Sequence, residues 1–507
     1  MTQLPIVPVL LPLAAAILLV FARLGGLRLQ RACNLLGTLC LLPISVELVR
    51  TSLSGAHQVY LLGNWIAPFG IVLVLDQLSA MMVLVTSVLA LGALGYAMAT
   101  GVDRRGPHFH VLFQIQLFGL NGAFLTGDVF NLFVFFEVLL LASYGLLLHG
   151  GGPLRTKAGL HYVITNLIGS TLFLFAVGTL YGMVGTLNIA DMAVKVATAP
   201  PENSGVIAAA GLVLLVVFGL KAAMFPLYLW LPGAYTHASA PVAALFAIMT
   251  KVGLYALIRV HGTVFGADAG ELAHYYTPWV LGAGLLTLPL AALGVMAARR
   301  LREQAAYLVL ASVATLLIGI GLNSPQALAA TLYYLLHSTL IAGGMFLLAD
   351  VIARSRGSHA DHFAPGPAIP HGPLIGSTFI FAAIALTGMP PLSGFFGKVW
   401  ILSAALDQGW FALILTVMLL SSLVMMIALT RTGSLLFYHT IPVDVVPGPP
   451  FHRTAFTAVI WLFAAGPLLV IFANPISAYT EAAAGQQFDT RAYIKAVLNT
   501  PATESAR

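Results

Sequence analysis

Four charged residues lie inside long apolar runs of this 507-residue chain, where nothing in the sequence would hydrate them. Glu137 occurs in GDVFNLFVFFEVLLLASY, Lys221 in VFGLKAAMFPLYLWL, Lys251 in AIMTKVGLY and Lys398 in PPLSGFFGK. A charge at mid-bilayer costs about 2.5–3.5 kcal/mol on insertion scales. Four such charges facing lipid would cost on the order of 10 kcal/mol, which is comparable to the whole stability of a protein. We therefore expect all four side chains to face the interior of a helix bundle or water.

Three lysines against one glutamate indicate proton chemistry. A static Glu137–Lys221 ion pair that only fixes helix packing is one interpretation, but it explains a single lysine. A buried lysine without an acidic partner can give up its proton and so escape the cost of desolvation, and a lysine that is later reprotonated is a proton carrier. We predict that Lys251 and Lys398 are proton sites and that the charge of Glu137 tunes the protonation of Lys221.

Prolines accompany two of these lysines. Pro226 follows Lys221, while Pro390 and Pro391 precede Lys398. A proline removes a backbone N–H and clashes with the preceding turn, so it opens a helix. The carbonyl groups freed in this way can hold water beside the lysine. The alternative is that these prolines only kink their helices.

Two histidines and an aspartate are further candidates. His337, in LYYLLHSTLIAGG, has an ordinary pKa near 6.5 that suits a proton relay, unless it is a hydrogen-bonded core residue. His237, in the THASAPVAAL turn, is either a point where protons enter or a loop residue. Asp128 is more typical of a helix N-cap than of a carrier.

Composition decides which class of protein must position these residues. The chain is 59% hydrophobic and 8% charged, whereas about a quarter of a soluble domain is charged. Apolar runs of roughly 20 residues, enough to span a bilayer, recur along the whole chain and are too long for barrel strands. We predict an all-α polytopic membrane protein with about fourteen transmembrane helices, with thirteen or fifteen left open. The predicted spans cover residues 4–22, 32–50, 70–99, 108–126, 128–149, 160–185, 206–230, 240–261, 276–298, 303–322, 326–352, 373–402, 409–437 and 454–473.

Basic loops alternate with loops that are poor in arginine. They follow the first, third, fifth, ninth and eleventh spans and contain Arg23, Arg28, Arg31, Arg104, Arg105, Arg155, Lys157, Arg299, Arg300, Arg302, Arg354 and Arg356. By the positive-inside rule these loops are cytoplasmic, which places both termini on the outer side.

A weak symmetry of pattern divides the chain. Spans four to eight and spans nine to thirteen have similar lengths, and the fourth span of each group is interrupted, once at Lys221 to Pro226 and once at Gly388 to Lys398. Paired interrupted helices mark an ion or substrate path, and five helices per group make the two repeats inverted. This organisation predicts three N-terminal helices over 1–107, the two five-helix repeats over 108–262 and 276–437, and a last helix with a C-terminal tail over 438–507.

Other chemistries find no support in the sequence. Cys33 and Cys40 lie seven residues apart on one predicted helix, a spacing that neither closes a disulfide nor offers a metal or iron–sulfur pattern. No phosphate-binding loop, metalloprotease motif, nucleophile elbow or haem motif occurs. The net charge of +6 is explained by the basic loops. We expect no cofactor, no bound metal and no nucleic-acid partner.

The order of these residues resembles a known superfamily. A glutamate in span five, a lysine and proline in span seven, and a THASAP turn before the lysine of span eight resemble the antiporter-like subunits of respiratory complex I and the Mrp cation/proton antiporters. TGDVFNLFVFFEVLLLASYGLLLHG and PPLSGFFGK most resemble the D-type subunits of Mrp complexes. The resemblance covers about residues 60–440. It implies a fourteen-helix fold with two inverted five-helix units in a bacterial inner membrane.

The resemblance also implies roles for individual residues. Glu137 and Lys221 match the coupling pair of the family, Lys251 its central lysine, His337 its histidine in span eleven, and Lys398 its terminal lysine. One position departs from the pattern, because many complex I relatives have a histidine in span ten where this chain has Thr315. A water molecule or Thr315 would have to connect Lys251 with His337.

Three functions fit these observations. The leading one is a component of a multisubunit Na⁺ or K⁺/proton antiporter, a secondary transporter and not an enzyme, which relays protons along buried residues and works with other membrane subunits. The alternative is a proton-pumping component of a redox complex of the complex I or membrane-bound hydrogenase type. The third is a scaffold that retains an idle channel.

Overall fold

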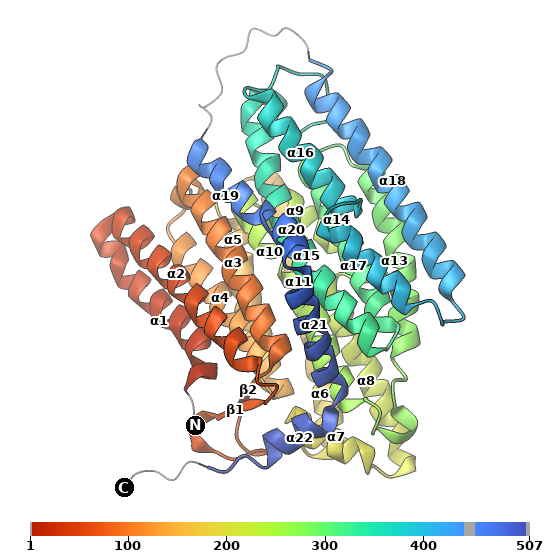
Figure 1. Cartoon of the computed structure of the whole chain (residues 1–507). Coiled ribbons are helices and arrows are strands. Elements are labelled where there is room, and N and C mark those ends of the chain that lie inside the picture. The colour runs from red at the N-terminus through yellow and green to blue at the C-terminus, as the bar shows by residue number, and fades with distance from the viewer. Residues whose placement is uncertain (1–2, 441–451, 503–507) are drawn as a thin grey trace.

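The computed structural model describes residues 3–440 and 452–502, and helices dominate it (Figure 1). Eleven helical segments among these residues are long and apolar enough to cross a membrane, and two shorter apolar helices accompany them. All fourteen predicted ranges are mostly helical. The predicted polytopic helical class is therefore confirmed, while the number of crossings stays a prediction.

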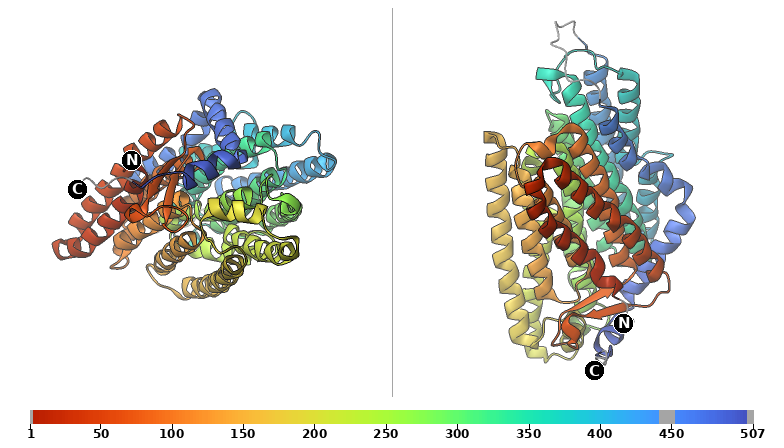
Figure 2. Two further views of the ribbon diagram at one scale, coloured as in Figure 1. Left: turned by 90° about the horizontal axis from the view of Figure 1, so that it is seen from below. Right: turned by 90° about the vertical axis from the view of Figure 1, so that its left-hand side faces the viewer.

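The long helices of the first half run roughly along a common direction, and the short helix α7 lies across them at the lower end (Figures 1 and 2). Their bounds are α1 Val7–Ala22, α2 Gly26–Ser52, α3 Gln77–Thr100, α4 Phe109–Leu125, α5 Val129–Leu148, α6 Pro153–Val184, α7 Ile189–Ala197, α8 Pro201–Ala222, α9 Trp230–His237, α10 Ala240–Phe246, α11 Met249–Ala256 and α12 Gly262–Val264.

The second half continues the bundle, and its last helices return to the first half, where α19 and α21 both pack against α3. Their bounds are α13 Thr277–Ala297, α14 Leu301–Gly321, α15 Pro325–Ser355, α16 Gly372–Thr387, α17 Ser393–Ala404, α18 Phe411–Phe437, α19 Arg453–Phe463, α20 Ala465–Ile471, α21 Ala473–Phe488 and α22 Thr490–Leu498. Short 3-10 turns occupy Leu4–Ile6, Arg23–Gly25, Leu62–Asn64, Val102–Arg104, Leu227–Leu229, Gly270–Leu272 and Gly357–His359.

A two-stranded antiparallel hairpin corrects the predicted start of the third span. Strand β1 (Gln58–Leu61) pairs with β2 (Val72–Leu75), and Gln58 lies opposite Leu75. Residues 70–75 were predicted as helix because they are apolar, but all four residues of β2 are buried in a sheet. Helix α3 begins only after Asp76, whose side chain accepts from the backbone N–H of Ser79.

The interruptions predicted in spans seven and twelve are confirmed. Helix α8 ends at Ala222, its C-cap Ala223 has a left-handed backbone at φ 61°, and helix resumes at Trp230. Helix α16 ends at Thr387, its C-cap Gly388 has φ 77°, where a residue without a side chain is favoured, and α17 begins at Ser393.

Span eight, predicted over residues 240–261, is one apolar helical segment, Ala240–Val264, that is long enough to cross a membrane. It consists of α10, α11, a π-helical turn over Leu257–His261 and the single turn α12. Arg259 and His261 lie in the π-helical turn, and both are buried.

The bundle has a buried centre and two different ends. The most apolar stretch of Ala240–Val264 is fully buried, and 94% of those of α14 and α15 is buried, but only 33% of that of α18. The centre of the molecule therefore lies around α10, α11, α14 and α15. The hairpin, α22 and both chain ends lie at the lower end in Figure 1. Because α1, α3, α5, α13 and α15 all run from that end, the five basic loops that follow them gather at the opposite end.

Candidate functional site

Glu137 and Lys221 do not touch, but helix α6 connects them. Half-buried Glu137 on α5 accepts a hydrogen bond from the hydroxyl of Ser170. The buried Lys221 Nζ on α8 donates to Asn166 Oδ1 at 3.2 Å. Asn166 and Ser170 are one helical turn apart on the same face of α6. No ion pair of 4.0 Å or less joins Glu137 and Lys221 among the described residues, and the neutral side chains of Asn166 and Ser170 lie between them.

Helix α11, which carries Lys251, packs closely against the end of α8. Gly253 makes this possible, because a Cβ atom there would lie 2.6 Å from the backbone nitrogen of Ala222 and 2.8 Å from the carbonyl oxygen of Phe218. Lys251, two residues earlier, is fully buried, and its Nζ donates to Ser312 Oγ on α14 at 3.1 Å. The central lysine is therefore held by a neutral hydroxyl.

A small cavity continues from Ser312 towards Lys398. Its lining includes Ser312 and Thr315 of α14, Tyr334 and His337 of α15, and Lys398 of α17. Its volume is about 10 Å³, close to the ~10–15 Å³ that one water molecule needs. The hydroxyl of Thr315 itself donates to the carbonyl of Ala311 at 3.0 Å. The predicted gap between Lys251 and His337 is thus a pocket, lined by both polar and apolar side chains, whose volume is at the lower limit for one water.

His337 is positioned by the break in span twelve. Its Nε2 lies 3.0 Å from the carbonyl oxygen of Ala385, which can only accept, so Nε2 carries a proton. Its Nδ1 lies 2.7 Å from Ser393 Oγ at the start of α17. Gly394 allows this approach, since a Cβ there would lie 2.7 Å from Nε2 and 2.4 Å from the oxygen of Ala385. Nδ1 is therefore the nitrogen that can exchange a proton with a neighbouring hydroxyl.

The terminal lysine uses a carbonyl that the same break leaves free. Lys398 Nζ donates to the carbonyl oxygen of Thr387, the last residue of α16, at 2.8 Å. It also donates to Ser422 Oγ on α18 at 2.9 Å. Gly388 and Pro390 end α16 here, so the oxygen of Thr387 has no partner in a following helical turn. The freed carbonyl was predicted to hold water, and in the structure it holds the lysine itself.

The prolines of the site lie on the outside of the chain. Pro226, Pro390 and Pro391 are exposed, so they shape the breaks without lining the polar interior. At the first break, Trp230 Nε1 donates to the carbonyl oxygen of Leu220 at 3.0 Å, which fills a second position predicted for water.

Two other candidates lie away from the lysines. The Nδ1 of His237 contacts the carbonyl oxygen of Gly233 at 2.9 Å, and the carbonyl of His237 accepts from Arg155 at the basic end. Asp128 caps α5 by accepting from the backbone N–H of Asn131 at 2.7 Å, as predicted.

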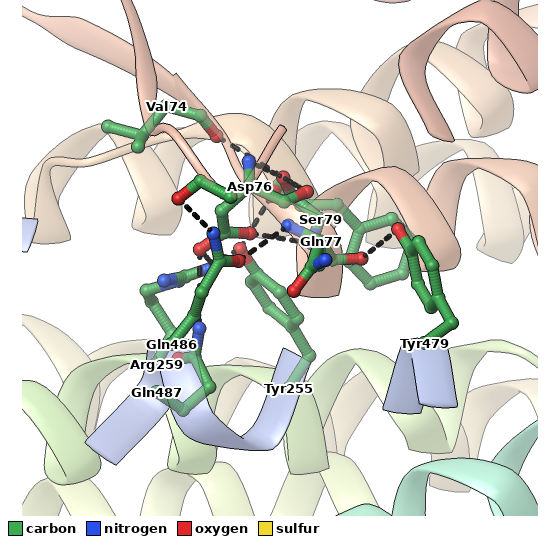
Figure 3. Close-up of polar contacts among 11 residues, drawn as sticks. Val74, Asp76, Gln77, Ser79, Tyr255, Arg259, Tyr479, Gln486 and Gln487 are labelled. Carbon is green, nitrogen blue, oxygen red and sulfur yellow. Dashed lines mark hydrogen bonds and ion pairs between the residues drawn. The ribbon is translucent and has the colours of Figure 1, made fainter. Parts of the chain in front are cut away.

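A buried ion pair that the sequence analysis missed lies at the hairpin end (Figure 3). Arg259 Nη2 lies 2.6 Å from Asp76 Oδ2, and both side chains are buried. Arg259 Nε donates to the hydroxyl of Tyr255, one turn after Lys251 on α11. Burial alone would raise the pKa of the Asp76 carboxyl, but the charge of Arg259 and the backbone N–H of Ser79 hold that pKa below its usual value. The pair is therefore ionised and fixes the end of span eight.

Helix α21, the second-last helix of the described residues, completes this cluster (Figure 3). Gln487 Nε2 donates to Asp76 Oδ2 at 3.2 Å, and Gln486 accepts from the backbone N–H of Gln77 at 3.0 Å. The hydroxyl of Tyr479 donates to the carbonyl of Gln77 at 2.8 Å. The segment predicted only as a C-terminal tail is thus a helix, α21, that closes the bundle at this end.

The neutral partners of the site also went unnoticed in the sequence. Asn166, Ser170, Ser312 and Ser422 are small uncharged polar residues on apolar helices, a common pattern in membrane proteins. The one available signal was the four-residue spacing of Asn166 and Ser170, which places both on one face of α6.

Comparisons with known proteins show which family the chain belongs to. Residues 126–424 match the family model described as "NADH:quinone oxidoreductase/Mrp antiporter, TM". The chain is 42% identical over 529 residues to a Rhizobium meliloti (strain 1021) protein named as the D component of a probable K(+)/H(+) antiporter, covering 98% of this chain and 97% of that protein. It is 36% identical to the D component of the Na(+)/H(+) antiporter of Bacillus subtilis (strain 168), with 98% of this chain and 100% of the relative covered. Among solved structures, the Mrp complex from Dietzia sp. DQ12-45-1b contains a chain with a TM-score of 0.87 at 27% identity, covering 98% of this chain and 100% of that one.

Proposed function

Because the chain belongs to the NADH:quinone oxidoreductase/Mrp antiporter membrane family, we propose that it is the proton-conducting D-type component of a multisubunit cation/proton antiporter. The exchanged cation is Na⁺ or K⁺, as in the names of the two relatives. The other membrane subunits of such a complex are its partners, and the bilayer is a bacterial inner membrane.

The cavity between Ser312 and Lys398 is the observation that supports this proposal most. It lies between the Ser312 hydroxyl, which holds Lys251, and the side chains of His337 and Lys398. Lys251, His337 and Lys398 can each gain and lose a proton. A purely structural set of charges would be paired with opposite charges. Here the lysines are held by an amide, a carbonyl and hydroxyls.

Each proton step then has a donor and an acceptor. The hydroxyl of Ser312 accepts from Lys251 and donates to the carbonyl of Val309 at 2.7 Å. When its O–H turns from Val309 to a water in the cavity, the ammonium of Lys251 gives a proton through Ser312 to that water, which passes it towards Lys398. His337 exchanges a proton at Nδ1 through Ser393, while its Nε2–H stays on the carbonyl of Ala385. Glu137 and Lys221 form the other end of the line, where the glutamate charge favours a protonated lysine.

The ends of the bundle give the orientation. The five basic loops face the cytoplasm by the positive-inside rule, so the hairpin and both termini face outward. A C-terminal reporter that is active only outside the cytoplasm tests this, and activity of the reporter only inside would reverse the orientation.

Exchange by the whole complex in everted vesicles tests the proton path. Dissipation of a pH gradient after addition of NaCl or KCl reports exchange, and Glu137→Ala, Lys221→Ala and Lys251→Ala should each abolish it. Lys157→Ala, an exposed lysine on α6 away from the line, is the control and should retain exchange. Exchange that survives all three site variants would refute the proton path and favour an idle scaffold.

Redox-driven pumping is the second candidate, because the family model covers NADH:quinone oxidoreductase subunits as well. Partner subunits that co-purify with iron–sulfur clusters or flavin, together with proton uptake that requires NADH or another reductant, would establish it. Exchange driven by a cation gradient alone would exclude it.

A further inference from the structure

A cavity of about 290 Å³ lies at the end of the bundle opposite the hairpin. The helices that supply it meet at their basic ends: the residues after α3, the starts of α6, α10 and α14, and the last turns of α15. We call it the basic cavity, and the side chains that define it are Arg105, Arg155, Ser239, Arg302, Asp350 and Arg354. It has room for much more than one water molecule.

The basic cavity carries an excess of positive charge. Arg302 and Arg354 share the carboxylate of Asp350, at 2.7 and 2.6 Å. Arg155 binds only carbonyl groups, those of His237 at 2.9 Å and His149 at 2.5 Å, and it lies within electrostatic range of Arg302. Four guanidinium groups therefore line the cavity with one carboxylate among them.

Two polar groups in its wall are left without a hydrogen bond. The hydroxyl of Ser239 is buried, with 5% of the residue exposed, and has no partner. The Nε of Arg302 also has no hydrogen-bond partner, and its nearest carboxylate, that of Asp361, is 3.9 Å away. A buried donor without a partner costs about 1–3 kcal/mol, so both groups favour a ligand that accepts hydrogen bonds.

Repulsion among the arginines points to the same kind of ligand. Like charges this close destabilise the empty cavity, and they disfavour the approach of a metal cation or a protonated water cluster. Guanidinium groups bind phosphate oxygens with paired N–H donors. We propose that the basic cavity binds a phosphate-bearing anion, either the headgroup of an anionic phospholipid or free phosphate.

Such a ligand would join the two groups of helices. Arg155 and Ser239 belong to α6 and to the residue before α10, whereas Arg302 and Arg354 belong to α14 and α15. A phosphate bound between them replaces the repulsion with shared contacts. This site is independent of the proton line, since none of its residues hydrogen-bonds to a lysine of that line.

Binding to the purified whole complex tests the proposal. Delipidated complex is titrated with phosphatidylglycerol, with phosphatidylcholine and with inorganic phosphate, and bound ligand is counted by native mass spectrometry. Phosphatidylglycerol or phosphate should bind about tenfold more tightly than phosphatidylcholine, with weaker binding at high salt. Binding of the lipid alone identifies a headgroup site, and binding of phosphate that competes with the lipid identifies the phosphate group as the common determinant.

Two variants with a matched control assign the binding to this cavity. Arg105→Gln changes an exposed residue without a side-chain hydrogen bond among the described residues, and it should weaken binding about five- to tenfold. Ser239→Ala should weaken binding about two- to threefold without lowering the melting temperature, because its hydroxyl is unpaired. The neighbouring Arg104→Gln should have no effect. Equal binding by all three variants, or equal binding of phosphatidylcholine, would overturn the proposal.

Discussion

The ammonium group of Lys251 lies 3.1 Å from the hydroxyl of Ser312, so a neutral partner holds the central lysine of this bundle. A carboxylate in that position would bind the proton and stop its movement. A hydroxyl can donate and accept in turn. This one donates to the carbonyl of Val309 at 2.7 Å and lies at the edge of the cavity that reaches His337 and Lys398, so a rotation of its O–H moves the donated proton to the cavity.

Ser312→Ala should slow cation/proton exchange about 5- to 100-fold, because losing a hydrogen bond to a charged, buried group costs about 1–3 kcal/mol. The initial rate of pH-gradient dissipation in everted vesicles measures it. Ser377→Ala, an exposed serine of α16, is the control. A rate for Ser312→Ala equal to that of the control would mean that the hydroxyl plays no part in the proton path.

Asn166→Ala and Ser170→Ala should each reduce exchange, and the double variant should lose less than the sum of the two effects. The reason is that both residues belong to one link between Lys221 and Glu137. A double-mutant cycle on exchange rates measures the coupling. Thr171→Ala, the exposed neighbour that bonds only to the carbonyl of Leu167, should leave the rate unchanged. Strict additivity would show that the two ends act separately.

Gly394→Ala should disturb the relay at His337. The added Cβ would lie 2.4 Å from the oxygen of Ala385, so α17 must move away from α15 and α16. Overpacking of this kind costs about 1–3 kcal/mol, and we expect a lower melting temperature together with slower exchange. Gly409→Ala meets no atom within 4 Å and should behave as the natural chain. Unchanged stability and exchange in Gly394→Ala would show that the break tolerates movement.

Asp76→Asn should destabilise the complex by about 3–5 kcal/mol, because it leaves Arg259 buried without a counter-charge. Thermal unfolding of the purified complex measures this effect. Asp268→Asn is the matched control, since the Asp268–Arg491 pair is exposed at the same end, and water screens exposed pairs so that they contribute little to stability. Equal melting temperatures for the two variants would show that the buried pair does not stabilise the fold.

Much of the fold follows from local sequence. In lipid, each long apolar run must form the hydrogen bonds of its own backbone N–H and C=O groups, so the helical class was predictable from composition. The breaks at Pro226 and at Gly388 to Pro391 were predictable because proline and glycine act on the adjacent turn. The hairpin was not, because the apolar residues 72–75 satisfy either a helix or a sheet and only their pairing with Gln58–Leu61 decides.

The residues of the candidate site also fall into two groups, those that were predictable from the sequence and those that were not. Lys221, Lys251 and Lys398 stood out in the sequence because a charge in an apolar run is costly wherever it lies. Their partners did not stand out, because a serine or an asparagine in a membrane helix costs little free energy. Such a residue indicates a site only when the tertiary structure places a lysine next to it.

The sequence by itself therefore determined the membrane class, the helix breaks and the ionisable residues, all of which depend on the energy of single residues or single turns. Only the tertiary structure decided what each charge contacts. It placed Ser312 beside Lys251, a water-sized cavity beside Thr315, and the pair of Asp76 and Arg259 across 183 positions of the chain. Such contacts join residues from distant helices, and no local preference records them.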